Sequence, residues 1–134
     1  MAIDWAFVGL GVIGEGIAPL IQASLALFEV ELTQAQELER TVFKSYLAGL
    51  RDASWHGNPQ LARFGYTASS ALRYGLGFIA LYLDLMLNFD ESKAVWVKQV
   101  FGCQIETFLD HIAELLRLLL DLGDEARALL DAVG

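Results

Sequence analysis

Residues 65–89 read GYTASSALRYGLGFIALYLDLMLNF and contain only two charged side chains, Arg73 and Asp84. Asn58 and the proline after it stand shortly before this run, and an asparagine followed by a proline is a strong signal for the N-cap and first turn of a helix. We therefore predict one long apolar helix that begins near residue 59 and ends near residue 88.

A second apolar segment lies near the N-terminus, from Trp5 to Phe28. Glu15 is the only ionisable side chain in it. We predict a second long helix here, in which Pro19 can introduce a kink. We expect the two apolar helices to pack against each other as an antiparallel hairpin.

Two further segments have the mixed apolar and polar pattern of amphipathic helices. The first covers residues 33–52, and Thr33 with Gln36 forms a capping-box pattern at its start. The second covers residues 90–122, with Asp90 as its N-cap. Both helices are polar enough to have one face in water.

Gly123 is expected to end the second amphipathic helix, and Asp124 to cap a last short helix. The chain contains no internal repeat or linker, so we expect residues 1–134 to form a single domain. The sequence thus predicts an all-α fold. We expect a four-helix-type bundle in which the first and third helices form the apolar hairpin, with two amphipathic helices and a short C-terminal helix beside it.

The composition indicates more apolar surface than one small domain can bury. Of the 134 residues, 55% are hydrophobic and only 19% are charged. Acidic residues outnumber basic ones 17 to 9, and a net charge of −8 argues against binding to nucleic-acid phosphates. The single cysteine, Cys103, excludes an internal disulfide. We expect the apolar surface to be covered by a membrane or by other protein subunits.

For each apolar segment, the free energy gained by inserting its apolar residues into a membrane is close to the cost of inserting its charged residues. Trp5 to Phe28 contains eleven Leu, Ile, Val or Phe residues, which contribute roughly −3 to −7 kcal/mol against about +3 kcal/mol for Glu15. The segment Gly65 to Phe89 contains nine, roughly −3 to −5 kcal/mol, against Arg73 and Asp84. We predict a membrane-associated protein, with a soluble cytoplasmic bundle as the alternative.

Small residues form a second pattern on both apolar segments. Interior glycines cost a water-exposed helix roughly 1 kcal/mol each, so they favour close packing of backbones. We predict a helix-packing interface that joins copies of the chain or joins it to a larger assembly. Its residues are Ala2, Gly9, Gly16 and Ala23 on the segment near the N-terminus, and Ala68, Ala71 and Gly75 on the apolar helix that begins near residue 59.

The hairpin places two opposite charges within reach of each other. If Phe28 is paired with Gly65, Glu15 lies opposite about position 78, roughly 8 Å along the axis from Arg73. A buried charge is tolerable when it is paired. We therefore predict a buried ion pair between Glu15 and Arg73.

Aromatic residues suggest a different function. In a soluble bundle they could line an apolar pocket that binds a lipid or another hydrophobic small molecule. The residues proposed for this pocket are Trp5, Phe78, Tyr82, Trp96 and Phe101. This alternative also assumes a homo-oligomer, with lipid as a further partner.

Gly9, Gly11 and Gly14 form a GxGxxG pattern after a short apolar run, and Glu31 follows about twenty residues later. Locally this resembles the start of NAD(P)-dependent hydroxyacid dehydrogenases. The resemblance covers about a quarter of the chain and implies a pyrophosphate site at the glycines and a ribose contact at the acid. A nucleotide-binding enzyme fragment is therefore a lesser alternative.

One acidic cluster is a candidate metal site. Glu106, Asp110 and Glu114 recur along one helix face with His111 beside them. A carboxylate-bridged metal site requires Glu-x-x-His, but position 108 is Phe and the other helices offer no matching histidine. Cys103 is about 12 Å from His111 along the helix axis, too far to be activated by it. We expect no metal, no cofactor and a non-enzymatic structural role.

Overall fold

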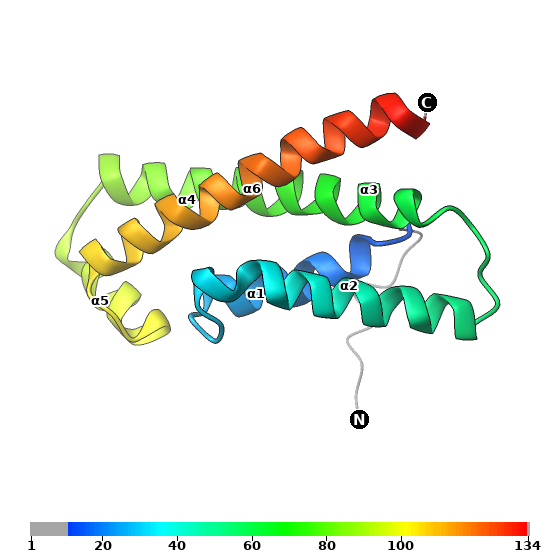
Figure 1. Ribbon diagram of the computed structural model, residues 1–134. Helices are drawn as coiled ribbons and strands as arrows, with labels where there is room; N and C mark the ends of the chain where they lie inside the picture. The colour runs from blue at the N-terminus through cyan, green and yellow to red at the C-terminus, as the bar shows by residue number, and fades with distance from the viewer. Residues whose placement is uncertain (1–10, 134) are drawn as a thin grey trace.

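The computed structural model describes residues 11–133, and every regular element in that range is a helix. The all-α prediction is confirmed for these residues. In chain order the α-helices are α1 (Ala18–Ala26), α2 (Ala35–Asp52), α3 (Pro59–Ser69), α4 (Leu76–Leu87), α5 (Glu91–Phe101) and α6 (Ile105–Val133). The 3-10 helix η2 (Glu15–Ile17) precedes α1, the 3-10 helix η3 (Leu32–Gln34) precedes α2, and the π-helix η4 (Ser70–Gly75) lies between α3 and α4 (Figure 1).

The elements α3, η4 and α4 form one uninterrupted helix, Pro59–Leu87, which we call the long helix. It begins as predicted, because the Asn58 side chain accepts a hydrogen bond of 2.9 Å from the backbone N–H of Gln60. The π turn in its middle was not predicted. One turn earlier the hydroxyl of Thr67 donates to the backbone carbonyl of Arg63 at 3.0 Å, a bond that bends helices.

The main partner of the long helix is α6, which runs antiparallel to it (Figure 1). Arg63, near the start of the long helix, contacts Glu125 near the end of α6. Gly75, further along the long helix, lies beside Leu119, which is earlier in α6. The apolar helix α1 packs on this pair, and the amphipathic helix α2 packs against α1 and η2.

The predicted helix boundaries in residues 90–133 are wrong in two places, at Gly102 and at Gly123. Gly102 has φ +72°, a left-handed conformation that ends α5, so the expected helix over 90–122 is divided in two. Gly123 does not end a helix, and α6 continues through it. A Cβ atom on Gly123 would lie 3.4 Å from the Cβ atom of Ala71, so the small residue serves the packing of α6 against the long helix.

The antiparallel hairpin of the first and third helices is also wrong. The carbonyl of Ile13 lies beside Gly65, and further along both segments Gln22 bonds to Ser70. The contacts therefore advance in the same direction on both segments, and α1 runs parallel to the long helix. The reason is visible in Figure 1, where α2 returns the chain to the starting end of α1 before the long helix begins.

Within residues 11–28 the apolar segment forms a shorter helix than expected. Its residues 5–10 lie outside the described range, and within that range helical backbone begins at Glu15. Gly14 has φ +92°, which a right-handed helix does not allow. Pro19 is in the first turn of α1, where no backbone N–H is required, and so it introduces no kink.

The core lies between α1, the long helix and α6. Its side chains come from one face of each helix, as the 3.6-residue periodicity requires. The largest completely buried side chains include Ile21 on α1, Tyr66 on the long helix, and Phe108, Ile112, Leu115 and Leu119 on α6. α5 closes one end of this core with Val97, which is also fully buried.

Candidate functional site

The predicted small-residue interface divides into two parts. Ala71 and Gly75 face α6, close to Gly123 and Leu119. Gly16 and Ala23 on the first segment are exposed, and no atom lies within 4 Å of a Cβ built on Gly16. The other small residues of this prediction are Ala68, which lies on α3, and Ala2 and Gly9, which are outside the described residues.

The closest backbone approach involves two glycines that were not assigned to the interface. A Cβ on Gly14 would lie 1.9 Å from the carbonyl oxygen of Ala62, and a Cβ on Gly65 would lie 2.0 Å from that of Ile13. The turn before α1 therefore sits directly on the backbone of α3. Gly14 is the third glycine of the GxGxxG pattern, and its role here is to allow this contact.

Glu15 and Arg73 lie close together, with 3.7 Å between Oε1 and Nη1. The pair is not buried, because the two side chains are 38% and 57% exposed, respectively. The antiparallel pairing from which this contact was predicted is wrong, because α1 and the long helix are parallel. At this exposure such a pair contributes about 0–1 kcal/mol.

The aromatic residues proposed for a ligand pocket are dispersed. Phe101 packs on Phe108 and, edge to face, on Trp96, with ring centroids 4.3 Å and 5.6 Å away. Phe78 and Tyr82 are half-buried against the core from the long helix. Trp5 lies outside the described residues. Within the described range these side chains contribute to packing around α5 and the long helix.

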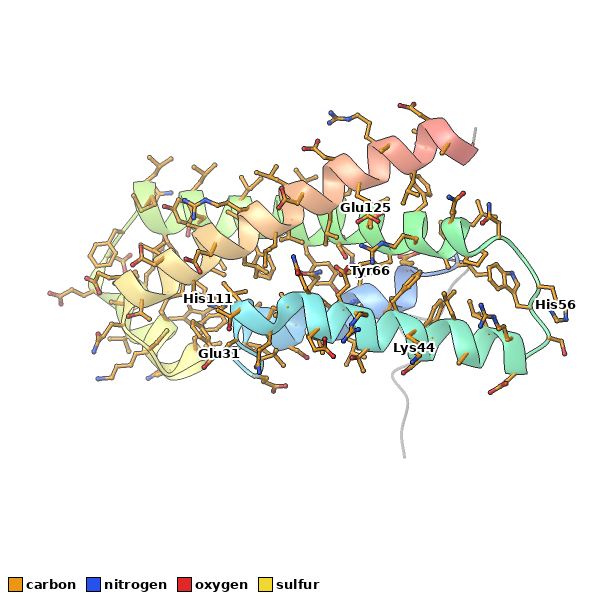
Figure 2. The ribbon with its side chains drawn as sticks, viewed as in Figure 1. Glu31, Lys44, His56, Tyr66, His111 and Glu125 are labelled. Carbon is orange, nitrogen blue, oxygen red and sulfur yellow. The ribbon has the colours of Figure 1, made fainter. Side chains whose placement is uncertain are left out.

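The histidine of the acidic cluster takes part in packing. His111 Nε2 lies 2.7 Å from the carbonyl oxygen of Leu25, and its ring stacks on Phe28 with centroids 3.9 Å apart. Figure 2 places His111 beside the connection between α1 and α2. Among residues 11–133 no three His, Cys, Asp or Glu side chains are arranged to hold a metal ion.

The glycine motif has no sheet beside it in the part of the chain that the structure describes, which contains no strand. A dinucleotide site of the dehydrogenase type requires a strand before the glycines and further parallel strands beside it. Gly11 and Gly14 instead lead into η2 and α1.

The long helix carries a stripe of large apolar side chains that face away from the core. They are between 38% and 65% exposed and are separated by four, three, four and three residues, the spacing of a coiled-coil seam. We call them the outer stripe: Leu72, Leu76, Ile79, Leu83 and Met86. Leu120 and Leu130 on α6 are similarly exposed, at 63% and 53%.

Between the outer stripe and α6 there is a groove of about 420 Å³. Small residues from both helices line it: Ala68, Ala71, Gly75, Gly123 and Ala126. Leucines border it on either side, among them Leu72 and Leu120. This combination of a small-residue floor and leucine edges allows another helix to approach closely.

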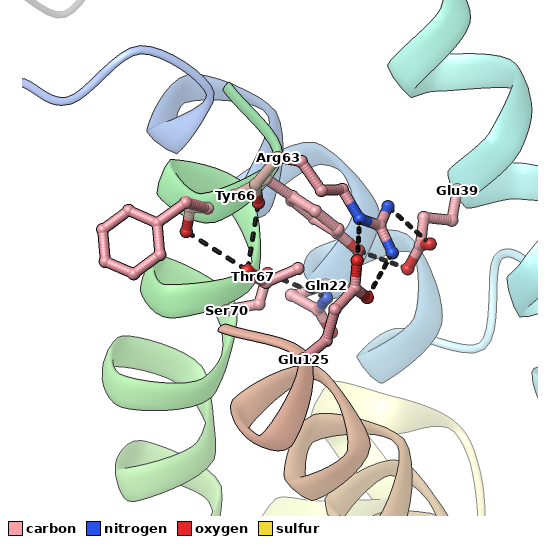
Figure 3. Close-up of polar contacts among 8 residues, drawn as sticks. Gln22, Glu39, Arg63, Tyr66, Thr67, Ser70 and Glu125 are labelled. Carbon is pink, nitrogen blue, oxygen red and sulfur yellow. Dashed lines mark hydrogen bonds and ion pairs between the residues drawn. The ribbon is translucent and has the colours of Figure 1, made fainter. Parts of the chain in front are cut away.

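The second notable feature is a polar cluster that joins three helices (Figure 3). Arg63 on the long helix forms two hydrogen bonds of 2.6 Å with Glu125 on α6, through Nε and Nη2. Its Nη1 is 2.8 Å from Glu39 on α2. The guanidinium also lies over the rings of Phe43 and Tyr66, at 5.4 and 5.3 Å. Arg63 therefore connects α2 and α6 to the long helix.

Burial alone would lower the pKa of Arg63, but hydrogen bonds and charge from Glu125 and Glu39 raise its pKa above the usual range. Tyr66 is fully buried, and its hydroxyl donates to Glu39 at 2.9 Å. Burial, and then the neighbouring charge of Glu39, raise the pKa of Tyr66 far above its usual value. Arg63 stays charged and Tyr66 stays neutral through the physiological pH range.

Sequence reasoning missed this cluster. Its members come from helices far apart in the chain. The sequence carries a signal only on the long helix, where Arg63, Tyr66 and the neighbouring Ser70 are polar. They are three and four residues apart, so they place polar groups on one face of an otherwise apolar helix.

Tyr66 leads to a prediction for alkaline solution. Its raised pKa means that the folded protein retains the phenolic proton when the unfolded chain loses it, above about pH 10. The free energy of unfolding should then fall with pH, by up to about 1.4 kcal/mol per unit from this group. Tyr66→Phe should remove that part of the slope and cost about 1 kcal/mol at neutral pH.

Urea unfolding from about pH 8 to about pH 11 would measure this difference. Tyr82→Phe, outside the cluster, is the control. Equal slopes for the wild type and Tyr66→Phe would contradict the assignment.

Comparison with protein-family models, with curated proteins and with solved structures finds no significant match to this chain.

Proposed function

We propose that this protein is a non-enzymatic helical subunit that assembles with further copies of itself through the outer stripe and the adjoining groove. The exposed outer stripe is the observation that carries this proposal. Five large apolar side chains in a coiled-coil spacing are an unusual surface for a solitary chain. Burying them against a second copy would remove them from water.

The shape of the groove supports a helix as the occupant. A twofold dimer is self-complementary, so the outer stripe of each copy could lie over the small residues of the other. Ala71, Gly75 and Gly123 would permit close approach. The long helix and α6 of each copy would then form a four-helix arrangement across the interface.

A membrane is the second candidate environment. Among residues 11–133 one helix, Pro59–Leu87, is long and apolar enough to cross a bilayer, which is also true of core helices in soluble proteins. Its partner α6 argues against crossing in this conformation, because it carries nine charged side chains. Each costs about 2.5–3.5 kcal/mol at the bilayer centre. In association with a membrane surface, the outer stripe would contact the lipid.

The test is the mass of the purified protein in solution, measured by light scattering during gel filtration without detergent. The wild type should elute at a multiple of the chain mass. Leu76→Glu with Leu83→Glu should raise the dissociation constant at least about 100-fold and give a monomer, because assembly would bury two charges on each copy. Val100→Glu on α5, a site 50% exposed in the chain, is the matched control and should assemble normally.

Two other outcomes would overturn the proposal. Disruption by Gly16→Leu, with assembly intact in the Leu76→Glu and Leu83→Glu variant, would assign the interface to α1. A wild type that is monomeric in buffer but floats with phosphatidylcholine vesicles would assign the outer stripe to lipid.

A further inference from the structure

The groove and the outer stripe are offset from each other along the long helix. On this helix the groove is lined by residues from Phe64 to Ile79, whereas the outer stripe runs from Leu72 to Met86. Leu83 and Met86 do not line the groove, and they are 49% and 54% exposed. Each chain therefore has an open groove at one end of this surface and two uncovered apolar side chains at the other.

The first four residues of the outer stripe have a spacing that reads the same in both directions. They are separated by four, three and four residues: Leu72, Leu76, Ile79 and Leu83. When a second copy is placed antiparallel, Leu72 can lie opposite the partner's Leu83. Leu76 then lies opposite the partner's Ile79, and a twofold axis passes between residues 77 and 78. The stripe is thus complementary to a reversed copy of itself.

The antiparallel direction also fills the groove. Met86 lies three residues beyond Leu83, so it reaches the partner at the level of residue 69, beside Ala68 in the groove. In a parallel pair each level of the long helix would meet the same level of its partner. The groove would then stay open at its Ala68 end, and the atoms that line an unfilled space lose their dispersion contacts. Packing therefore favours the antiparallel direction.

Two opposite charges flank the same layers. Arg73 and Asp84 come directly after the first and the fourth of these apolar positions, so both lie on one flank of the outer stripe. Within the chain they contact Glu15 and Lys93, but their side chains are still 57% and 51% exposed. An antiparallel copy brings its Asp84 beside Arg73. In a parallel pair the two levels would be about 16 Å apart along the axis.

On the basis of the proposed self-assembly, we propose that two copies pair antiparallel and that each fills the groove of the other with its Leu83 and Met86. The groove is completed by side chains from the partner copy. The Arg73 and Asp84 contacts at the rim define the direction, because charge complementarity contributes more to specificity than to affinity.

Disulfide trapping measures this direction. In a Cys103→Ser background, Leu72→Cys and Leu83→Cys are made as separate proteins, one of them isotope-labelled so that its mass is distinct. The two proteins are mixed, allowed to exchange subunits and oxidised in a glutathione buffer. A disulfide requires Cβ atoms about 3.5–4.5 Å apart, which the antiparallel pair provides between residue 72 of one copy and residue 83 of the other. Mixed disulfides should exceed either homotypic disulfide at least about tenfold.

Leu72→Cys mixed with Val100→Cys on α5 is the matched control and should give little mixed disulfide, because Val100 lies outside the outer stripe. An excess of homotypic disulfides at both residue 72 and residue 83 would show a parallel pair and overturn this arrangement, as would a statistical mixture. Failure of the assembly itself looks different: the wild type would have the mass of a monomer, and no mixture would form disulfides above the control.

The rim charges give a second readout that needs no cysteine. Asp84→Arg should raise the dissociation constant of the assembly at least about threefold, because the new charge faces the partner's Arg73. Adding Arg73→Asp to the same chain should bring the constant back to within about twofold of the wild type. Light scattering over a range of protein concentrations measures both. Without this restoration, the antiparallel contact between these residues would be contradicted.

Discussion

Replacing Gly65 by alanine should lower the free energy of unfolding by about 2–4 kcal/mol, even though alanine is the better helix former. The added Cβ would lie 2.0 Å from the carbonyl oxygen of Ile13 and 3.1 Å from Val12 Cγ1. The first of these atoms belongs to the backbone, so no side-chain rotation relieves the clash. The turn before α1 would have to move away from α3.

Gly77→Ala is the matched control on the same long helix. No atom lies within 4 Å of a Cβ built there, and the position is exposed. This variant should gain about 0.5–1 kcal/mol from helix propensity and reduced entropy of the unfolded chain. Urea unfolding followed by circular dichroism would measure both changes. If Gly65→Ala were as stable as Gly77→Ala, the contact between residue 13 and α3 would be wrong.

Replacing Arg63 by methionine should cost about 2–4 kcal/mol at neutral pH. Methionine retains much of the apolar stem, but Glu39 and Glu125 would be left facing each other without the intervening positive charge. This loss of stability should be smaller than the loss on breaking a completely buried ion pair, because the Glu39 and Glu125 side chains are 23% and 37% exposed.

Arg40→Met provides the comparison at an exposed pair. Arg40 and Glu37 are 74% and 66% exposed, so this change should cost no more than about 1 kcal/mol. A double-mutant cycle with Glu125→Gln would isolate the coupling to Arg63. Glu125→Gln should destabilise the wild type more than it destabilises Arg63→Met. Additive effects of the two substitutions would show that the contact contributes nothing to stability.

Local signals in the sequence were enough to locate several helix ends. Asn58 caps α3 and Asp90 caps α5, in each case through a side-chain oxygen that accepts from a backbone N–H two or three residues later. A cap depends only on its immediate neighbours, so it can be recognised without knowledge of the tertiary structure. The all-α class follows from the same local patterns.

Glycines were harder to interpret, because the same residue serves different purposes. Gly102 adopts a left-handed conformation and ends a helix, whereas Gly123 lies inside α6 where it meets Ala71. Gly14 and Gly65 are required by a contact between segments about fifty residues apart in sequence. Which backbones meet is a property of the assembled fold, and periodicity alone does not determine it.

The direction of α1 and the polar cluster were missed for a related reason. A hairpin pairing assumes that the two apolar segments are antiparallel, but the intervening helix α2 reverses the chain once more. Glu39, Arg63 and Glu125 come together only after α2, the long helix and α6 have packed. Charge patterns report neighbours on the same helix, and these three side chains lie on different ones.

The π turn of η4 changes the direction in which side chains project from the long helix. A π turn contains more residues than an α turn, so the helix beyond it is rotated relative to the helix before it. Arg63 and Tyr66, before the turn, are directed to α2 and α6, whereas Leu76 and Leu83, after it, point away from the core. One continuous helix thereby holds the Arg63 contacts before the π turn and presents Leu76 and Leu83 to a partner after it.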